Sequence, residues 1–459
     1  MELKKYKLAD IANIEISGVD KKTIEGETPV RLCNFVDVYY NWAITKEKAK
    51  SFMLASAKQT EIDKCSIGKG MVAITKDSET RDDIGIATYI ANDFEDVLLG
   101  YHCALITPNP AIVDGKYLNA FMHTRYIQKY FENNASGSGQ RYTLSNDTIG
   151  NIPVLLPSIE VQHTIGKVLS DIDRKIELNK QINDNLETMA KQLYDYWFVQ
   201  FDFPNEEGKP YKSSGGAMVW NENLKREIPQ GWVVEKMGKC TNVLLGGTPD
   251  TNDNSLWGNG YNWLNSGEVA EFPILKSEKN ITPKGLEKSA TVLAPKGSVT
   301  LSITRHLRPS ILCIDACINQ SVVAILENDK VSKEYIYPLL NRDIPRLMSL
   351  RTGAQQPHIN KETVEAINVI LPPANIMGAY INIAESIYNA IFNNAKEVEE
   401  LTKQRDELLP LLMNGQASVN YHLSVHFFLP LYYIETNTIL WHERNNYTSR
   451  FRRYASGSD

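Results

Sequence analysis

The chain has 459 residues, of which 42% are apolar and 23% charged, and its formal net charge is −6. This composition is ordinary for a globular protein and excludes wholesale disorder, while the negative charge argues against a protein that coats nucleic acid by bulk electrostatics. A local basic groove stays possible on such a chain, so composition leaves DNA binding open.

No segment has the character of a membrane helix or a metal-binding motif. No run approaches the ~20 apolar residues of a bilayer span, and residues 1–10 are charged, without the apolar core of a signal peptide. The six cysteines are scattered without a Cys-x-x-Cys pair, which favours reduced, buried thiols over disulfides or a zinc site. We therefore expect a cytoplasmic protein with no metal site and no membrane partner.

Residues 1–157 are predicted to form the first domain. Short apolar runs such as Met71-Val-Ala-Ile-Thr75 and Cys103-Ala-Leu-Ile-Thr107 are split by Gly, Pro, Asn and Asp, which is typical of short strands joined by turns. One helix is expected near residues 115–132. This mixture predicts an α+β domain.

Residues 158–200 have a different rhythm and are predicted to form the first spacer helix. Apolar residues and Asn recur at alternating steps of four and three, which is the heptad pattern of a coiled-coil seam. A helix of ~40 residues is ~60 Å long, more than one domain needs. The seam includes Ile172, Ile176, Asn179 and Leu186.

The same pattern returns after a shift of 215 residues (355 − 140), which places Gln140 on Gln355. Residues 229–373 are therefore expected to repeat the first domain, and residues 374–416 the long helix. Two copies indicate a pseudo-dimer rather than a solenoid. The second helix has its seam at Ile387, Ile391, Asn394 and Leu401.

A leucine-rich stripe on a single helix commonly packs on the core of its own domain. Two such stripes in register, each too long for one domain, favour packing of the helices against each other as a coiled coil. Asn179 and Asn394 would then lie in the seam, where a buried amide lowers stability but specifies the register.

Two segments lie outside the repeat. Residues 201–228, which are rich in Pro, Gly and Ser, read as the connecting segment that returns the chain to the second domain. Residues 417–459 have no counterpart after the first helix and are interpreted as an atypical C-terminal tail. Read-through sequence and partner binding both stay open for this tail.

Enzyme signatures are missing from the sequence. There is no phosphate-binding GxxxxGK loop, no GxSxG elbow, no HExxH zinc helix and no GxGxxG dinucleotide loop behind a strand. The Asn-Pro-Pro-aromatic tetrad that would grip a flipped adenine is also missing. We expect no catalysis by this chain alone.

Polar loops at corresponding places in both halves are candidate DNA contacts. The Arg guanidinium can donate two hydrogen bonds to the edge of guanine, and the Gln or Asn amide can pair with the edge of adenine. Lys, Ser and backbone amides commonly bind phosphates. A solvated loop is the alternative for each residue, and the Gln-containing loops could equally position the following strand. The candidates are Lys76, Ser78, Arg81, Gln140, Arg141, Thr248, Ser302, Thr304, Arg305, Arg308, Gln355 and Gln356.

Several short sequence segments, in their order and spacing along the chain, resemble those of the specificity subunit of a type I restriction-modification system. The resemblance covers nearly everything from residue 7 to residue 419. The sequence departs from the repeat at Met377, which stands where the first copy has Gln162. The segments include Leu156-Pro-Ser-Ile-Glu-Val-Gln162, Tyr194-Asp-Tyr-Trp-Phe198, Gly246-Gly-Thr-Pro249, Ile318-Asn-Gln-Ser321 and Leu408-Leu-Pro-Leu-Leu-Met-Asn-Gly-Gln416.

The resemblance implies a specific architecture and set of partners. It implies two similar target recognition domains in a pseudo-twofold arrangement, each reading one half of a split site in double-stranded DNA, separated by two long antiparallel coiled-coil helices. It also implies two modification subunits, which methylate adenine with S-adenosylmethionine, and restriction subunits driven by ATP and Mg. This chain itself would hold no cofactor.

Two other functions stay open on the residues alone. A remnant or rearranged specificity subunit could act only as a coiled-coil scaffold, without DNA reading. A fragment of a self-contained restriction enzyme, whose catalytic part is lost or encoded separately, is the other alternative.

Overall fold

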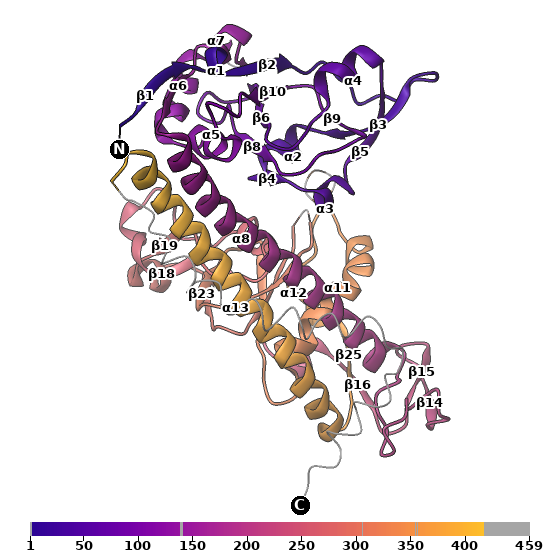
Figure 1. Ribbon diagram of the computed structural model, residues 1–459. Coiled ribbons are helices and arrows are strands. Elements are labelled where there is room, and N and C mark those ends of the chain that lie inside the picture. The colour runs from indigo at the N-terminus through magenta and orange to yellow at the C-terminus, as the bar shows by residue number, and fades with distance from the viewer. Residues whose placement is uncertain (1, 138–140, 305, 354, 356, 417–459) are drawn as a thin grey trace, which may run out of the picture. The chain divides into compact units, whose positions relative to one another are not determined.

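The computed structural model describes residues 2–137, 141–304, 306–353, 355 and 357–416. The chain divides into two compact units, one built from Met1–Glu177 and a C-terminal segment that begins at Glu399, the other built around Leu178–Val398. Each unit contains an α+β head and parts of two long helices, α8 (Ile159–Tyr194) and α13 (Ala374–Met413) (Figure 1). The expected tail, residues 417–459, lies outside the described residues.

The first head is organised around a five-stranded sheet. Its strand order is β2-β10-β6-β8-β4, and all four residues of β6 and of β8 are buried, as expected for apolar strands covered on both faces. The bounds are β2 Ala12–Ile16, β10 Cys103–Pro108, β6 Val72–Thr75, β8 Ala87–Ile90 and β4 Ala43–Ile44.

Three smaller sheets complete the first head. In one of them β3 pairs with β5 antiparallel and with β9 parallel, and in another β1 pairs with β13 just before α8 begins. The bounds are β3 Thr28–Cys33, β5 Met53–Ala57, β9 Val97–Leu99, β1 Lys4–Lys7, β13 Pro153–Leu156, β7 Asp77–Ser78, β11 Ser136–Gly137 and β12 Tyr142–Thr143.

The helix expected near residues 115–132 is divided into two. Its first part ends at Met122, and Thr124 then caps the second part, because the Thr124 hydroxyl accepts a hydrogen bond from the Ile127 amide at 3.4 Å. The helices of this head are α1 Leu8–Ile11, α2 Phe35–Tyr39, α3 Lys46–Ala49, α4 Gln59–Cys65, α5 Gly115–Met122, α6 Arg125–Asn134 and α7 Asn146–Gly150.

The second head repeats the topology of the first. The order β17-β24-β21-β22 matches β2-β10-β6-β8. In both sets of four strands, the strand that comes first along the chain lies at one end, and the last, second and third strands follow it across the sheet. Likewise, β18 pairs with β19 antiparallel and with β23 parallel, as β3 does with β5 and β9. The bounds are β17 Val243–Leu245, β24 Val322–Ile325, β21 Val299–Ser302, β22 Pro309–Ile311, β18 Trp257–Leu264, β19 Lys279–Ile281, β23 Ala316–Ile318, β20 Val292–Ala294, β16 Val233–Lys236 and β25 Asn368–Leu371.

The segment between the first spacer helix and the second repeat is structured. Phe201 and Phe203 are buried in the core of the second unit, and the chain then forms an antiparallel hairpin, β14 (Met218–Asn221) with β15 (Arg226–Pro229). The remaining elements are the π-helix Asp195–Val199, the 3₁₀ turns Asn254–Leu256 and Glu268–Ala270, and helices α9 Met237–Cys240, α10 Pro283–Glu287, α11 Lys333–Ser349 and α12 Lys361–Glu365.

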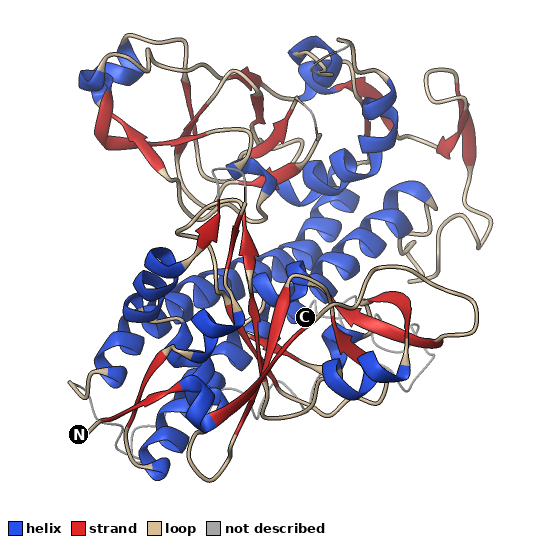
Figure 2. Ribbon diagram, turned by 90° about the horizontal axis from the view of Figure 1, so that it is seen from above, coloured by secondary structure: helices blue, strands red, loops and turns tan. Residues whose placement is uncertain are grey.

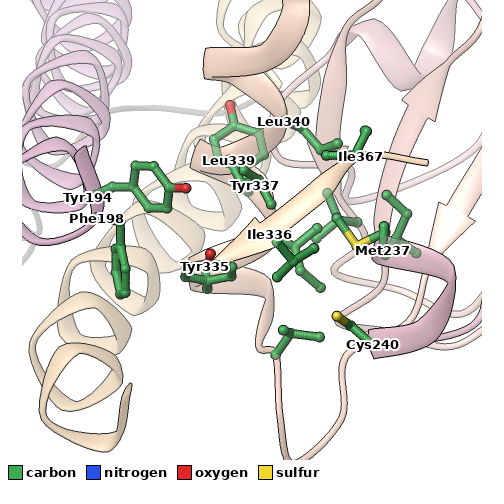
Figure 3. Close-up of a cluster of buried hydrophobic side chains, with 14 of the residues drawn as sticks. Tyr194, Phe198, Met237, Cys240, Tyr335, Ile336, Tyr337, Leu339, Leu340 and Ile367 are labelled. Atoms are coloured by element: carbon green, nitrogen blue, oxygen red, sulfur yellow. The ribbon is translucent and has the colours of Figure 1, made fainter. Parts of the chain in front are cut away.

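Aromatic side chains fasten α8 to the second head. Phe198 contacts Tyr335 of α11 and Tyr380 of α13 edge-on, with both ring centroids at 4.8 Å. Pro338 within α11 leaves the Glu334 carbonyl without its helical donor, and the Tyr380 hydroxyl donates to that carbonyl at 2.9 Å. Figure 3 shows Tyr194 of α8 and Phe198 of the π-helix that follows it in this buried cluster, together with residues of α9 and α11.

The two long helices lie side by side and antiparallel (Figures 1 and 2). In the second unit the Asn394 amide donates to the Asn183 side chain at 3.0 Å, and Asn179 donates to Glu397 at 2.8 Å. In the first unit Arg405 lies 3.6 Å from Asp173. Successive residues of α8 therefore contact residues that come progressively earlier in α13, as expected for antiparallel helices.

The predicted seam residues are all at least partly buried. Asn394 has Asn183 as its partner, whereas Asn179 reaches a charged side chain on the other helix. The side chains of Ile176, Asn179, Ile391 and Leu401 are buried, and those of Ile172, Leu186, Ile387 and Asn394 are partly buried.

Candidate nucleic-acid interface

In the first head, several loops meet at one end of the five-stranded sheet. Strand β6 ends at Thr75, which pairs with Cys103 at the start of β10, so the segment after β6 and the segment before β10 emerge together. The two segments are joined by a hydrogen bond from the Lys76 amide to the His102 carbonyl at 2.9 Å. His102 has a positive φ of 74°, a backbone conformation that is uncommon outside glycine.

A short ribbon brings Arg141 to the same place. Strand β7 pairs with β12, so that Asp77 lies opposite Thr143, and the Leu144 amide donates to the Lys76 carbonyl at 2.8 Å. Strand β11, which pairs with β12, requires glycine at Gly137, where φ is +157° and an added Cβ would lie 2.0 Å from the Arg141 carbonyl oxygen.

Asp77 is the centre of this cluster, and only 7% of the residue is exposed. Its Oδ2 lies 2.6 Å from His102 Nδ1, 3.1 Å from Arg141 Nη2 and 3.5 Å from Lys76 Nζ. Burial by itself would raise the pKa of Asp77, but hydrogen bonds from Thr143, His102 and Arg141, with the charge of Lys76, hold that pKa below its usual value. The carboxylate is therefore ionised at neutral pH and acts as an acceptor for the surrounding cations.

The other predicted residues of the first head lie beside this cluster. The guanidinium of Arg81 lies over the ring of Tyr142, with 5.1 Å between Cζ and the ring centroid. The Ser78 hydroxyl accepts a hydrogen bond from the Thr80 amide at 3.3 Å. Lys76, Ser78, Arg81 and Arg141 are thus gathered on one surface, while Gln140 lies outside the described residues.

In the second head, the predicted residues gather at the corresponding end of β21. Ser302, at the end of this strand, is buried, and its hydroxyl donates to the Thr304 carbonyl at 3.3 Å. The Ser302 amide donates to the carbonyl of Arg308, whose side chain is exposed. Thr304 also forms an isolated antiparallel bridge with His358.

Thr248 reaches this end of the sheet by another route. Its hydroxyl donates to the Gln320 side chain, and the neighbouring Ser321 carbonyl accepts from the Ile303 amide at 2.9 Å. Gly246 makes this possible, because an added Cβ would lie 2.1 Å from the Ile318 carbonyl oxygen. Gln355 is exposed in the loop before His358, and Arg305 and Gln356 lie outside the described residues.

The two clusters occupy equivalent positions but contain different chemistry. The pairing of Asp77 with Thr143 in the first head corresponds to the bridge between Thr304 and His358 in the second, and the offset of 215 between Thr143 and His358 is that of the sequence repeat. A buried carboxylate therefore stands in the first head where the second has a threonine.

Sequence reasoning missed several members of both clusters. Asp77 stood within a predicted loop but was not named as a DNA contact. His102 and Gln320 were not among the candidates either, because strands distant in sequence bring them to these clusters. His358 could have been found, since the repeat places it on Thr143.

Within the described ranges, no helix is long and apolar enough to cross a bilayer. No group of three or more His, Cys, Asp or Glu residues arranged for a metal ion occurs there either.

Comparison with known proteins gives consistent matches. A family model described as the type I restriction modification DNA specificity domain matches residues 1–188 and 229–403. The chain is 25% identical over 322 residues to the type I restriction enzyme MjaIX specificity subunit of Methanocaldococcus jannaschii, with 68% of this chain and 71% of that protein covered. It is 23% identical over 394 residues to the HindI specificity subunit of Haemophilus influenzae, with 74% and 85% covered.

A solved structure has a similar fold. The S subunit of a type I restriction-modification system from M. genitalium superposes with a TM-score of 0.52 at 13% sequence identity, and the match covers 90% of this chain and 96% of that one. At this identity the likeness concerns the fold alone.

Proposed function

This chain belongs to the type I restriction-modification DNA specificity family, and we propose that it reads a DNA target in two parts, one with each head. In such a system the specificity subunit is the non-catalytic component that recognises the DNA target. The proposal adds that Lys76, Ser78, Arg81 and Arg141 contact one half-site. It further assigns the other half-site to residues of the second head, among them Thr248, Ser302, Thr304 and Arg308.

One observation carries the proposal: each head places a polar cluster at the same end of the same sheet. The order β2-β10-β6-β8 recurs as β17-β24-β21-β22, and the polar residues follow β6 in one head and β21 in the other. Protein contacts to base edges need side chains that project from a firmly positioned scaffold, and both clusters meet that condition. Different side chains at equivalent positions support half-sites of different sequence.

The domain organisation is proposed as the sequence suggested it. Residues 1–157 and 229–373 form the two recognition domains, residues 158–200 and 374–416 the spacer helices, and residues 201–228 the connection. The paired helices would set the distance between half-sites and provide the surface for two modification subunits. S-adenosylmethionine would be bound by those subunits, and ATP and Mg by the restriction subunits.

Selection of binding sites from random double-stranded DNA tests this function. The purified chain, in complex with its modification subunits, should enrich two short defined blocks separated by a fixed number of undefined base pairs. Arg81→Ala should change only one block, and Arg308→Ala only the other. Enrichment of a single continuous block would contradict a two-part target, and absence of any enrichment would favour the scaffold alternative.

A further inference from the structure

The buried carboxylate of the first head has no assigned role in DNA reading. We propose that Asp77 is a positioning residue that orients Arg141 to read one guanine in the half-site contacted by the first head. The inference rests on the proposed function and deepens it, because it names the base, the residue that reads it and the residue that holds the reader in place.

The contacts of Arg141 leave most of its donors available. A guanidinium carries five N–H groups in one plane, and Asp77 Oδ2 accepts from Nη2 at 3.1 Å. His102 contacts the same Nη2. Within the described part of the chain, Nε and Nη1 have no protein partner, and 54% of the side chain is exposed. One nitrogen of the guanidinium, Nη2, is thus held by the protein, and Nε and Nη1 stay available to a ligand.

Asp77 is itself held firmly enough to act as an anchor. It lies in β7 opposite Thr143 of β12, and the Lys76 amide before it is bonded to the His102 carbonyl. His102 approaches the carboxylate from the segment before β10, with its Nδ1 at 2.6 Å from Asp77 Oδ2. Three chain segments therefore converge on one ionised side chain and restrict the rotamers of the arginine that it pairs with.

A fixed guanidinium plane suits a base edge better than a phosphate. Guanine presents two acceptors, O6 and N7, in the major groove, whereas adenine presents one acceptor and one donor, which would face an arginine N–H. A phosphate contact needs mainly positive charge, and the adjacent carboxylate reduces that charge. The arrangement therefore favours directional reading of guanine over general attraction to the backbone.

Among the described residues of the second head, no carboxylate and arginine are paired at the equivalent position, which provides an internal comparison. Thr304 occupies the position of Asp77, and the sequence repeat places Gln356 where the first head has Arg141. The carboxylate-anchored arginine, and the guanine with it, are therefore assigned to the first head.

Mapping of methylated adenines tests the inference. The chain and its cognate modification subunits are expressed in a host that lacks adenine methylation, and the methylated motif is determined by single-molecule sequencing. Arg141→Lys keeps the charge but removes the fork, so one guanine of one half-site should become degenerate, with its discrimination falling by roughly 5- to 150-fold. Asp77→Asn should relax the same position to a smaller extent, with the spacer and the other half-site unchanged.

Two further variants complete the design. Arg125→Ala, which removes an exposed arginine from α6 of the same head, should leave the motif intact. Arg308→Ala should alter only the opposite half-site, which identifies the half-site read by the first head. Thermal unfolding of each purified variant verifies that the head is folded, and the exposed Arg141→Lys change provides the test if Asp77→Asn destabilises the head.

The outcomes separate this inference from the function on which it rests. A defined wild-type motif that Arg141→Lys and Asp77→Asn leave unchanged would overturn the guanine assignment alone. Methylation that falls evenly at every site, without a relaxed position, would overturn it too, since that pattern is expected of a phosphate contact. A wild-type complex that methylates no defined sequence would refute the proposed function and this inference with it.

Discussion

Arg405→Ala is expected to loosen the C-terminal end of α13 from the first head. The Arg405 guanidinium lies over the ring of Trp42, with 4.8 Å between Cζ and the ring centroid, and its Nη1 is 3.6 Å from Asp173 Oδ1 on α8. Only 19% of the arginine side chain is exposed. Trp42 stacks in turn on His123, at a centroid distance of 4.4 Å and an interplanar angle of 15°. One side chain thus joins α13, α8 and the head.

The size of the effect follows from these contacts. A cation over a tryptophan face contributes about 0.5–2 kcal/mol, and more when it is desolvated. Loss of the arginine also removes an ion-pair partner of the mostly buried Asp173 carboxylate, which adds about 1–3 kcal/mol. We expect Arg405→Ala to reduce the free energy of local opening by about 2–4 kcal/mol, which corresponds to at least roughly 30-fold faster amide exchange.

Hydrogen exchange followed by mass spectrometry measures this opening directly. Peptides covering residues 399–413 should exchange faster in the variant, whereas peptides from the part of α13 in the second unit should not change. Lys403→Ala is the matched control, because Lys403 is exposed on the same helix. Equal exchange of residues 399–413 in Arg405→Ala and the wild type would refute the argument that these contacts hold the helix end.

Three other predictions concern the helices and the first head. Asn183→Leu and Asn394→Leu should each lower the free energy of unfolding in urea by about 1–3 kcal/mol, because each removes the partner of one polar atom of the other asparagine. The double variant should lose clearly less than the sum of the two losses, and strict additivity would contradict the pairing. Burial, followed by the charge of Arg405, lowers the pKa of His123 to about 4. The contribution of neutral His123 to stability should therefore be present above about pH 6.5 and lost as pH falls towards 4. The free energy of unfolding in urea should depend less on acid pH in His123→Gln, and an unchanged dependence would refute the assignment. Insertion of four residues after Asp184, with a matching insertion after Asn393 to keep the pairing, lengthens each helix by ~6 Å. The DNA spacer in the methylated motif should then become longer by about two base pairs. Altered half-sites with an unchanged spacer would show that the helices do not set the distance between half-sites.

The duplicated architecture could be predicted from sequence because its signals are local or periodic. Apolar strands bounded by turn residues, two heptad patterns and an offset of 215 were sufficient to expect two α+β heads and paired helices, and the comparisons confirm that fold. The break between α5 and α6 was not predicted, because a capping threonine within an otherwise helical run gives a weak signal. The asymmetric partners of Asn179 and Asn394 depend on the crossing geometry of the helices, which heptad positions do not specify.

The candidate interface was predictable only in part, for a physical reason. Residues that follow a strand, such as Lys76 and Arg81, can be assigned to a loop from the sequence. The convergence of Asp77, His102 and Arg141 depends on strand register and on a positive φ at His102, and neither can be read from residue types. In the sequence, polar residues that belong to one cluster were therefore interpreted as separate loop residues.

The two heads differ in the residues that follow their central strands and in the junctions with the long helices. The central strands are buried in both heads, so packing constrains their sequence; they are β6 and β8 in the first and β21 and β24 in the second. The residues just beyond β6 and β21 lie outside these strands, and there Asp77 of the first head corresponds to Thr304 of the second, each paired across to a neighbouring segment. The junctions with the long helices also differ, since Gln162 bonds to the Ile112 and Pro157 carbonyls whereas Met377 packs among apolar side chains. A duplicated frame of this kind allows each head to acquire its own reading chemistry while the shared helices stay paired.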